Sequence, residues 1–77
     1  MMKSSLEDFE TGWYGMKVRL DIADIDKLIE YLQLLRKDDE YHFHIFSTAF
    51  EKNSGGISDV EFSRKIDSEI SNMEIGA

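Results

Sequence analysis

The sequence of 77 residues contains no cysteine. This absence excludes disulfide bonds and thiolate metal sites, so a metal ion would need histidine and carboxylate ligands. Long apolar runs are also missing: none approaches the ~18 residues required to cross a membrane. The first ten residues lack a basic region followed by an apolar stretch, so no signal peptide is predicted. We therefore expect a cytoplasmic protein with no membrane association.

Positive charge is scarce as well. Nine Lys and Arg stand against sixteen Asp and Glu, which gives a formal net charge of −7. Binding to a phosphate backbone requires a cationic surface, so nucleic acid is not an expected partner. The acidity suits a basic or neutral protein partner, and it equally serves to keep a small domain in solution.

The composition predicts one folded domain, residues 1–77. Hydrophobic residues make up 42% of the chain and include one Trp, three Tyr and five Phe, which is richer than a disordered chain. At this length, folding hides only roughly 60–65% of the surface that the unfolded chain exposes. We therefore expect a thin core, for which self-association is a common remedy.

The clearest periodic segment, Ile22–Lys37, predicts an amphipathic helix. Aliphatic residues recur there at three- and four-residue steps and share one face, namely Ile25, Leu28, Ile29, Leu32 and Leu35. Aspartates crowd the amino end while Arg36 and Lys37 occupy the carboxyl end, each where the helix dipole favours its charge. A sheet is expected to cover the aliphatic face.

Strand patterns flank the helix. Residues 13–21 alternate between apolar and polar, which predicts a half-buried strand. Residues 41–50 are rich in aromatic and β-branched residues and predict a second strand. Residues 57–62 have strand composition and follow Gly55 and Gly56, which suit a hairpin connection.

Three segments leave alternatives open. Residues 57–62 favour a third strand, but they also fit the start of a helix with a capping box. Residues 72–76 are a candidate fourth strand. Within residues 1–11, residues 6–10 fit either a short edge strand or a frayed arm. The predicted fold is α+β and two-layered, one helix on a sheet of three to four strands in β-α-β-β order, with room for an extra terminal strand.

Two histidines give the only chelating pattern. His42 and His44 are one residue apart in a strand, so both rings point to one face about 7 Å apart along the backbone. Asp59 or Glu61 on a neighbouring strand is a candidate third metal ligand. Histidine pairs also arise because His tolerates half-exposed strand positions, and we assign no metal and no cofactor from the sequence. No serine lies in an elbow-like turn and Gly55-Gly56 is too short for a phosphate loop, so no enzyme is predicted.

The face of the predicted sheet away from the helix carries large aromatic residues beside charge. Aromatic residues and Arg are enriched in protein interfaces, so this face predicts a homodimer or a partner-binding surface. The alternative is that the chain termini fold over it. The candidate binding residues are Trp13, Arg19, His42, His44, Phe46 and Phe50.

Three segments carry a family resemblance: Lys17-Val18-Arg19-Leu20, Asp26-Lys27-Leu28-Ile29-Glu30-Tyr31-Leu32, and His42-Phe43-His44 followed by Gly55-Gly56. Together they resemble small bacterial immunity-type proteins, the acidic single-domain antidotes of polymorphic toxin systems. The resemblance covers about residues 16–62. It implies a cytoplasmic binding module that occupies a toxin domain and performs no catalysis, and it transfers no site residue.

Overall fold

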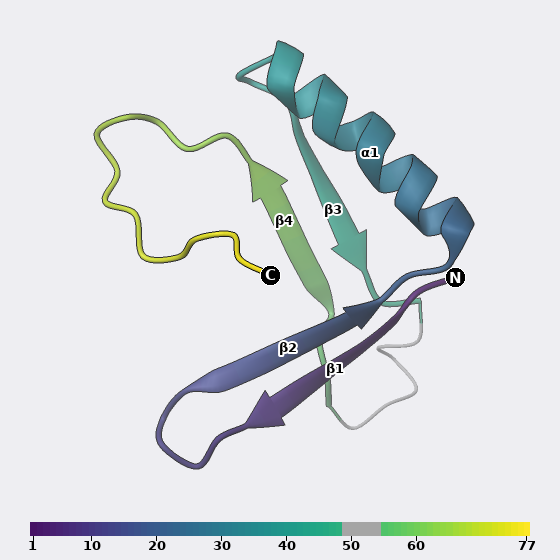
Figure 1. Ribbon diagram of the computed structural model, residues 1–77, viewed down its shortest axis with the longest axis vertical. Coiled ribbons are helices and arrows are strands. Elements are labelled where there is room, and N and C mark those ends of the chain that lie inside the picture. The colour runs from purple at the N-terminus through teal and green to yellow at the C-terminus, as the bar shows by residue number, and fades with distance from the viewer. Residues whose placement is uncertain (49–54) are drawn as a thin grey trace.

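The computed structural model describes residues 1–48 and 55–77, and confirms the α+β class (Figure 1). In the described residues the chain forms a helix and two hairpins. The elements in order are β1 (Lys3–Asp8), β2 (Tyr14–Arg19), α1 (Ile22–Lys37), β3 (His42–Phe46) and β4 (Asp59–Ser63).

The first hairpin pairs β1 with β2 in antiparallel register from Lys3 opposite Arg19 to Asp8 opposite Tyr14. In the turn, the backbone N–H of Phe9 donates to the Trp13 carbonyl (3.2 Å). Gly12 adopts a φ of +88°, a conformation that glycine reaches without a Cβ penalty. The strand predicted over residues 13–21 is confirmed with shorter ends. Of the two readings of residues 6–10, the edge strand is confirmed, although it begins at residue 3 and ends at residue 8.

Gly15 lies beneath the Phe9 ring, because a Cβ built at Gly15 would lie 2.7 Å from the Phe9 Cζ. Aromatic rings often cover strand glycines in this way. We expect Gly15→Ala to displace the half-exposed Phe9 ring and to lower the free energy of unfolding by up to about 1 kcal/mol. Loss of the ring-current shift of the residue 15 Hα by NMR would report the displacement. Gly55→Ala is the control because a Cβ there meets nothing within 4 Å; an unchanged ring-current shift in the Gly15 variant would contradict the contact.

The predicted helix is confirmed over Ile22–Lys37 as α1. Its N-cap is Asp21, whose backbone N–H donates to the Asp24 Oδ2 (3.1 Å), as in a capping box. It ends where the N–H of Asp38 donates to the Leu34 carbonyl (3.1 Å). The described part of the chain contains no helix long and apolar enough to cross a membrane.

The expectation that the whole aliphatic face of α1 is covered was wrong. No residue of α1 is buried, and the half-buried ones form a narrow row: Asp24, Leu28, Tyr31 and Leu35. Beside that row runs an exposed set of aliphatic side chains that we call the helix stripe: Ile22, Ile25, Ile29 and Leu32. The physical reason is width: strands lie ~5 Å apart, so a two-stranded sheet is too narrow to cover the full apolar face of a helix.

The second hairpin carries the core. β3 and β4 are antiparallel, with Phe43 opposite Phe62 and Ile45 opposite Val60. The Phe43 ring stacks on Phe62 with centroids 5.0 Å apart and tilts against Tyr31 of α1 at 5.5 Å. At 6% exposure, Phe43 is the sole buried hydrophobic residue in residues 1–48 and 55–77.

The second and third predicted strands are confirmed over shorter ranges. The second spans His42–Phe46 rather than residues 41–50, and residues 49 and 50 lie outside the described residues. The third spans Asp59–Ser63, so the strand reading of this segment is correct and the helix reading is not. Residues 72–76 form no strand, and the side chains of Ile70, Met73 and Ile75 are almost fully exposed. The C-terminal tail therefore covers neither hairpin.

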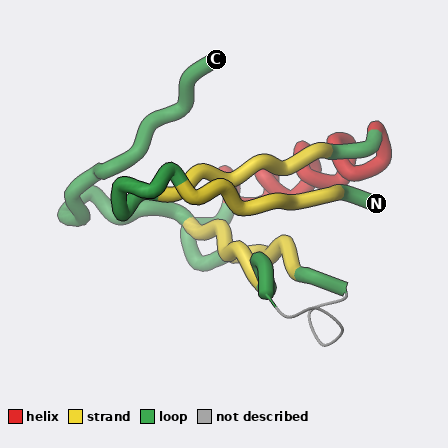
Figure 2. Tube along the Cα trace, turned by 90° about the horizontal axis from the view of Figure 1, so that it is seen from below, coloured by secondary structure: helices red, strands yellow, loops and turns green. Residues whose placement is uncertain are grey.

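The strands form two separate two-stranded sheets in place of the predicted single sheet. Figure 2 shows the two strand pairs as distinct units. In each hairpin the strands pair with each other over their whole length, and β2 is not joined to β3 by sheet hydrogen bonds in the described residues. Local pairing across a short turn costs less loop entropy than joining strands separated by a helix, which explains the preference for β1 as the partner of β2.

Candidate functional site

The outer face of the second hairpin gathers imidazole and carboxylate groups. Residues directly opposite in an antiparallel pair share a face of the sheet. The register places His42 opposite Ser63, His44 opposite Glu61, and Phe46 opposite Asp59. These six residues define the histidine face, which points away from the Phe43 side as the alternation in β3 predicted.

His44 lies at the centre of this face and contacts two carboxylates. Its Nδ1 lies 3.0 Å and 3.1 Å from the two carboxylate oxygens of Asp59. Its Nε2 lies 3.6 Å from the Glu61 Oε1. The ring of His42 meets the ring of His44 edge-on, with centroids 5.2 Å apart. All of these groups are exposed at the surface.

Three of these side chains have the donor set of a metal site. His42, His44 and Glu61 each offer one ligand atom, and the three atoms lie within 4.8 Å of one another. The sequence named Asp59 and Glu61 as interchangeable candidates for a third ligand. The structure separates them, since Glu61 belongs to the three-residue group and Asp59 binds the opposite nitrogen of His44. The sequence signal for both residues is their spacing: Asp59 and Glu61 are two residues apart, so in a strand their side chains point to the same face.

Of the other predicted binding residues, Trp13 and Arg19 do not join this face. Trp13, 77% exposed, lies in the turn of the first hairpin, and Arg19 lies at the opposite end of that hairpin, across from Lys3. Because the two hairpins are separate sheets, the expected continuous surface from Trp13 to the histidines does not form. Phe46 is 68% exposed on the histidine face. Phe50 lies outside the described residues.

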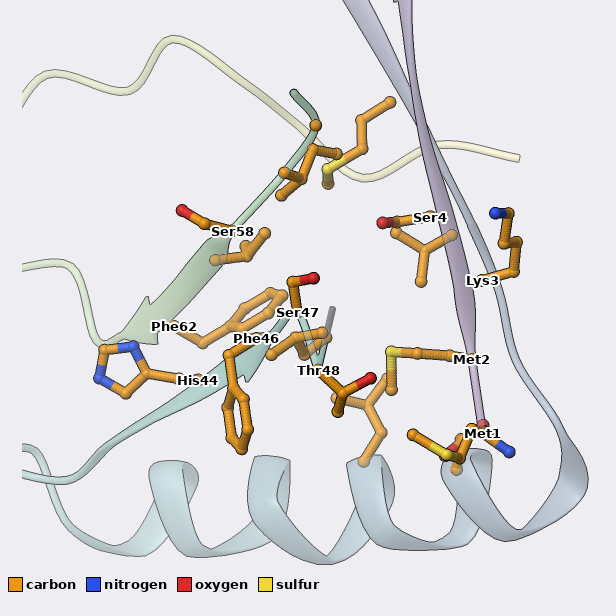
Figure 3. A pocket seen from close by; sticks show the side chains of 18 of the residues that line it. Met1, Met2, Lys3, Ser4, His44, Phe46, Ser47, Thr48, Ser58 and Phe62 are labelled. Atoms are coloured by element: carbon orange, nitrogen blue, oxygen red, sulfur yellow. Dashed lines mark ion pairs between the residues drawn. The ribbon is translucent and has the colours of Figure 1, made fainter. Parts of the chain in front are cut away.

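A large hollow that the sequence did not predict lies between the two hairpins and α1. Its volume is about 830 Å³, and its apolar walls include Met16, Val18, Leu28, Phe43, Ile45 and Val60. Figure 3 shows Met1 and Met2 lying across it from Ser47 and Thr48, with α1 running along one side. A tightly packed interior has few voids larger than a water molecule, so residues 1–48 and 55–77 do not by themselves form a fully packed core.

The chain start is held near this hollow by charge. The α-amino group of Met1 forms an ion pair with the Asp21 carboxylate and lies 3.8 Å from the Asp24 Oδ2. The hydrogen bond to Asp21, aided by the charges of Asp21 and Asp24, raises the pKa of this amino group above its ordinary value of 8.0. The contact is solvent-exposed and joins the first hairpin to the start of α1.

Comparisons of the chain with protein-family models, with curated proteins and with solved structures gave no match.

Proposed function

We propose that this chain is a protein-interaction module that completes its apolar core on a protein partner. The observation that carries the proposal is the size of its surface. The accessible area is 7406 Å², whereas a folded monomer of 9.0 kDa exposes about 4,900 Å². The radius of gyration is 14.4 Å against about 11.5 Å for a compact domain of this length. Part of this excess belongs to the exposed residues 64–77, and a standard interface needs only about 800 Å² on each partner.

Two parts of the exposed surface are apolar: the helix stripe and the hollow. The helix stripe presents four aliphatic side chains, of which Ile25 and Ile29 are 37% and 50% exposed. The hollow beside the second hairpin adds a concave apolar surface. Monomeric proteins rarely leave contiguous apolar patches of this kind uncovered, and such patches mark interaction sites.

Charge favours a basic protein over a second copy of the chain. Each chain carries a formal net charge of −7, so self-association brings two acidic bodies together, while a basic partner gains attraction at long range. The resemblance to immunity-type proteins makes this partner a bacterial toxin domain, which the module occupies in the cytoplasm without catalysis of its own. A small homo-oligomeric domain is the second candidate, and the same apolar surface supports it.

Small-angle scattering with light scattering on the isolated chain tests the proposal. We expect a mass of 9.0 kDa, a radius of gyration near 14.4 Å and strong binding of an apolar dye. Addition of the product of the gene neighbouring its own should give a one-to-one complex and suppress dye binding. A compact monomer near about 11.5 Å with no dye binding would show that the chain closes its own core, and would contradict the proposal. A doubled mass that falls on dilution would identify a second copy as the partner.

A further inference from the structure

The His42, His44 and Glu61 cluster has a geometry that apolar packing does not explain. All three side chains are exposed, yet their potential ligand atoms lie within 4.8 Å of one another on one face of β3 and β4. The cross-strand pairing of His44 with Glu61 fixes the backbone positions of two of them. His42 is two residues along β3 on the same face, so the strand holds the third.

Asp59 determines which nitrogen of His44 is available. A carboxylate accepts hydrogen bonds, so the 3.0 Å and 3.1 Å contacts require the Nδ1 of His44 to carry a proton and donate it. In the neutral ring the Nε2 then carries a lone pair, and it lies 3.6 Å from the Glu61 Oε1. Two electron-rich atoms this close repel each other unless a proton or a metal cation lies between them. A carboxylate that binds the far nitrogen of a histidine is also the arrangement that orients histidine ligands in metal sites.

We propose that His42, His44 and Glu61 bind a divalent transition-metal ion of the zinc type, with Asp59 as the positioning residue for His44. Zinc binds histidine nitrogen and carboxylate oxygen at about 2.0–2.2 Å, which separates tetrahedral ligand atoms by about 3.4 Å. The Nε2 of His44 and the Oε1 of Glu61 are already close to that separation at 3.6 Å. Rotation of the exposed side chain of His42 brings in the third ligand.

The donor set selects the metal class. Two imidazoles and one carboxylate suit zinc, cobalt or nickel, whereas magnesium and calcium prefer oxygen ligands alone. Three protein ligands leave at least one coordination position open to water or to a group from another molecule. The site uses only the second hairpin, so it holds or fails independently of the proposed partner surface.

Zinc titration of the full chain, followed by NMR of the imidazole nitrogens, tests the site. The chain has two histidines, so the spectrum contains only four imidazole nitrogens to assign. We expect the Nδ1–H form of His44 before titration, and a shift of its Nε2 and of one His42 nitrogen as one zinc ion binds per chain. Magnesium at the same concentration should shift neither ring.

Variants distinguish a specific zinc site from non-specific binding of zinc by exposed histidines. Glu61→Gln should weaken zinc binding by at least about 10-fold. Asp59→Asn should weaken it by about 10–100-fold, the range for residues that orient a metal-binding histidine. Asp67→Asn makes the same change outside the cluster and should bind zinc like the unmodified chain. Far-ultraviolet circular dichroism of each variant confirms that the hairpins persist.

Three results would overturn the proposal. One is the absence of histidine shifts at about 100 μM zinc, because structural zinc sites bind far more tightly than this and would be saturated at that concentration. Another is equal zinc affinity in the Glu61→Gln, Asp59→Asn and unmodified chains. The last is one zinc ion per two chains with a doubled mass, because it places the ion between copies. If both nitrogens of His44 are protonated and zinc causes no shift, the first result applies. A proton then occupies the place between His44 and Glu61 that we assign to the metal ion.

Discussion

Phe43→Ala is expected to lower the free energy of unfolding by about 3–5 kcal/mol, the range for a large aromatic residue removed from a core. Phe43 is the only described hydrophobic residue that is buried, and it touches both Phe62 across the hairpin and Tyr31 on α1. Removing its ring takes away the contact that joins α1 to the second hairpin. A single core in a chain of this length rarely supplies more than about 3–5 kcal/mol, so we expect the variant to be largely unfolded at 37 °C.

Phe46→Ala is a matched control because it removes the same side chain from the same strand. Phe46 is 68% exposed on the opposite face, so its loss should change the free energy of unfolding by no more than about 0.5 kcal/mol. Urea denaturation followed by circular dichroism measures both variants. Equal destabilisation by the two substitutions would show that Phe43 is not the centre of the core.

The second large effect concerns the helix stripe. The double substitution Ile25→Ser with Ile29→Ser is expected to weaken binding of the protein partner by at least about 100-fold. Apolar residues at the centre of an interface cost more than 1 kcal/mol each when removed, and about 1.4 kcal/mol from each gives that factor. Ile25 and Ile29 are 37% and 50% exposed in the free chain, so each substitution should lower the free energy of unfolding by about 1–2 kcal/mol.

Leu34→Ser provides the comparison for this surface. Leu34 lies on the same helix with 40% exposure, but on the opposite flank beside Lys27, Glu30 and Lys37. It should leave partner binding within about threefold of the unmodified chain. Calorimetric titration with the partner, or the dimer dissociation constant if the partner is a second copy, measures the effect. Unchanged binding by the double variant would place the interface elsewhere on the chain.

Local patterns predicted the elements well. The helix was recovered with its exact bounds, because three- and four-residue spacing and charged ends act within one segment. The alternation in β3 correctly placed Phe43 toward α1 and the histidines on the other face. The third strand was favoured over a helix on β-branched and aromatic content, and β4 confirms it.

The residues of the candidate site were predicted from the sequence, but their arrangement in space was not. His42 and His44 were recognised as a same-face pair, and both acidic residues were named as candidates. Their distinct roles depend on the register of β4 against β3, and a shift of one residue would move both carboxylates to the opposite face of the sheet. Trp13 and Arg19 were assigned to the same surface as the histidines because one sheet was assumed, and the separate hairpins remove that continuity.

The sequence by itself determined the α+β class, the helix, the alternation of each strand and the acidic charge, because all of these arise from neighbours along the chain. Tertiary structure alone decided that the strands close into two hairpins, that α1 keeps an exposed stripe, and that a hollow separates the parts. These outcomes depend on which edges pair and how wide a sheet becomes. Those choices compare distant segments in free energy, and no single segment of sequence carries that comparison.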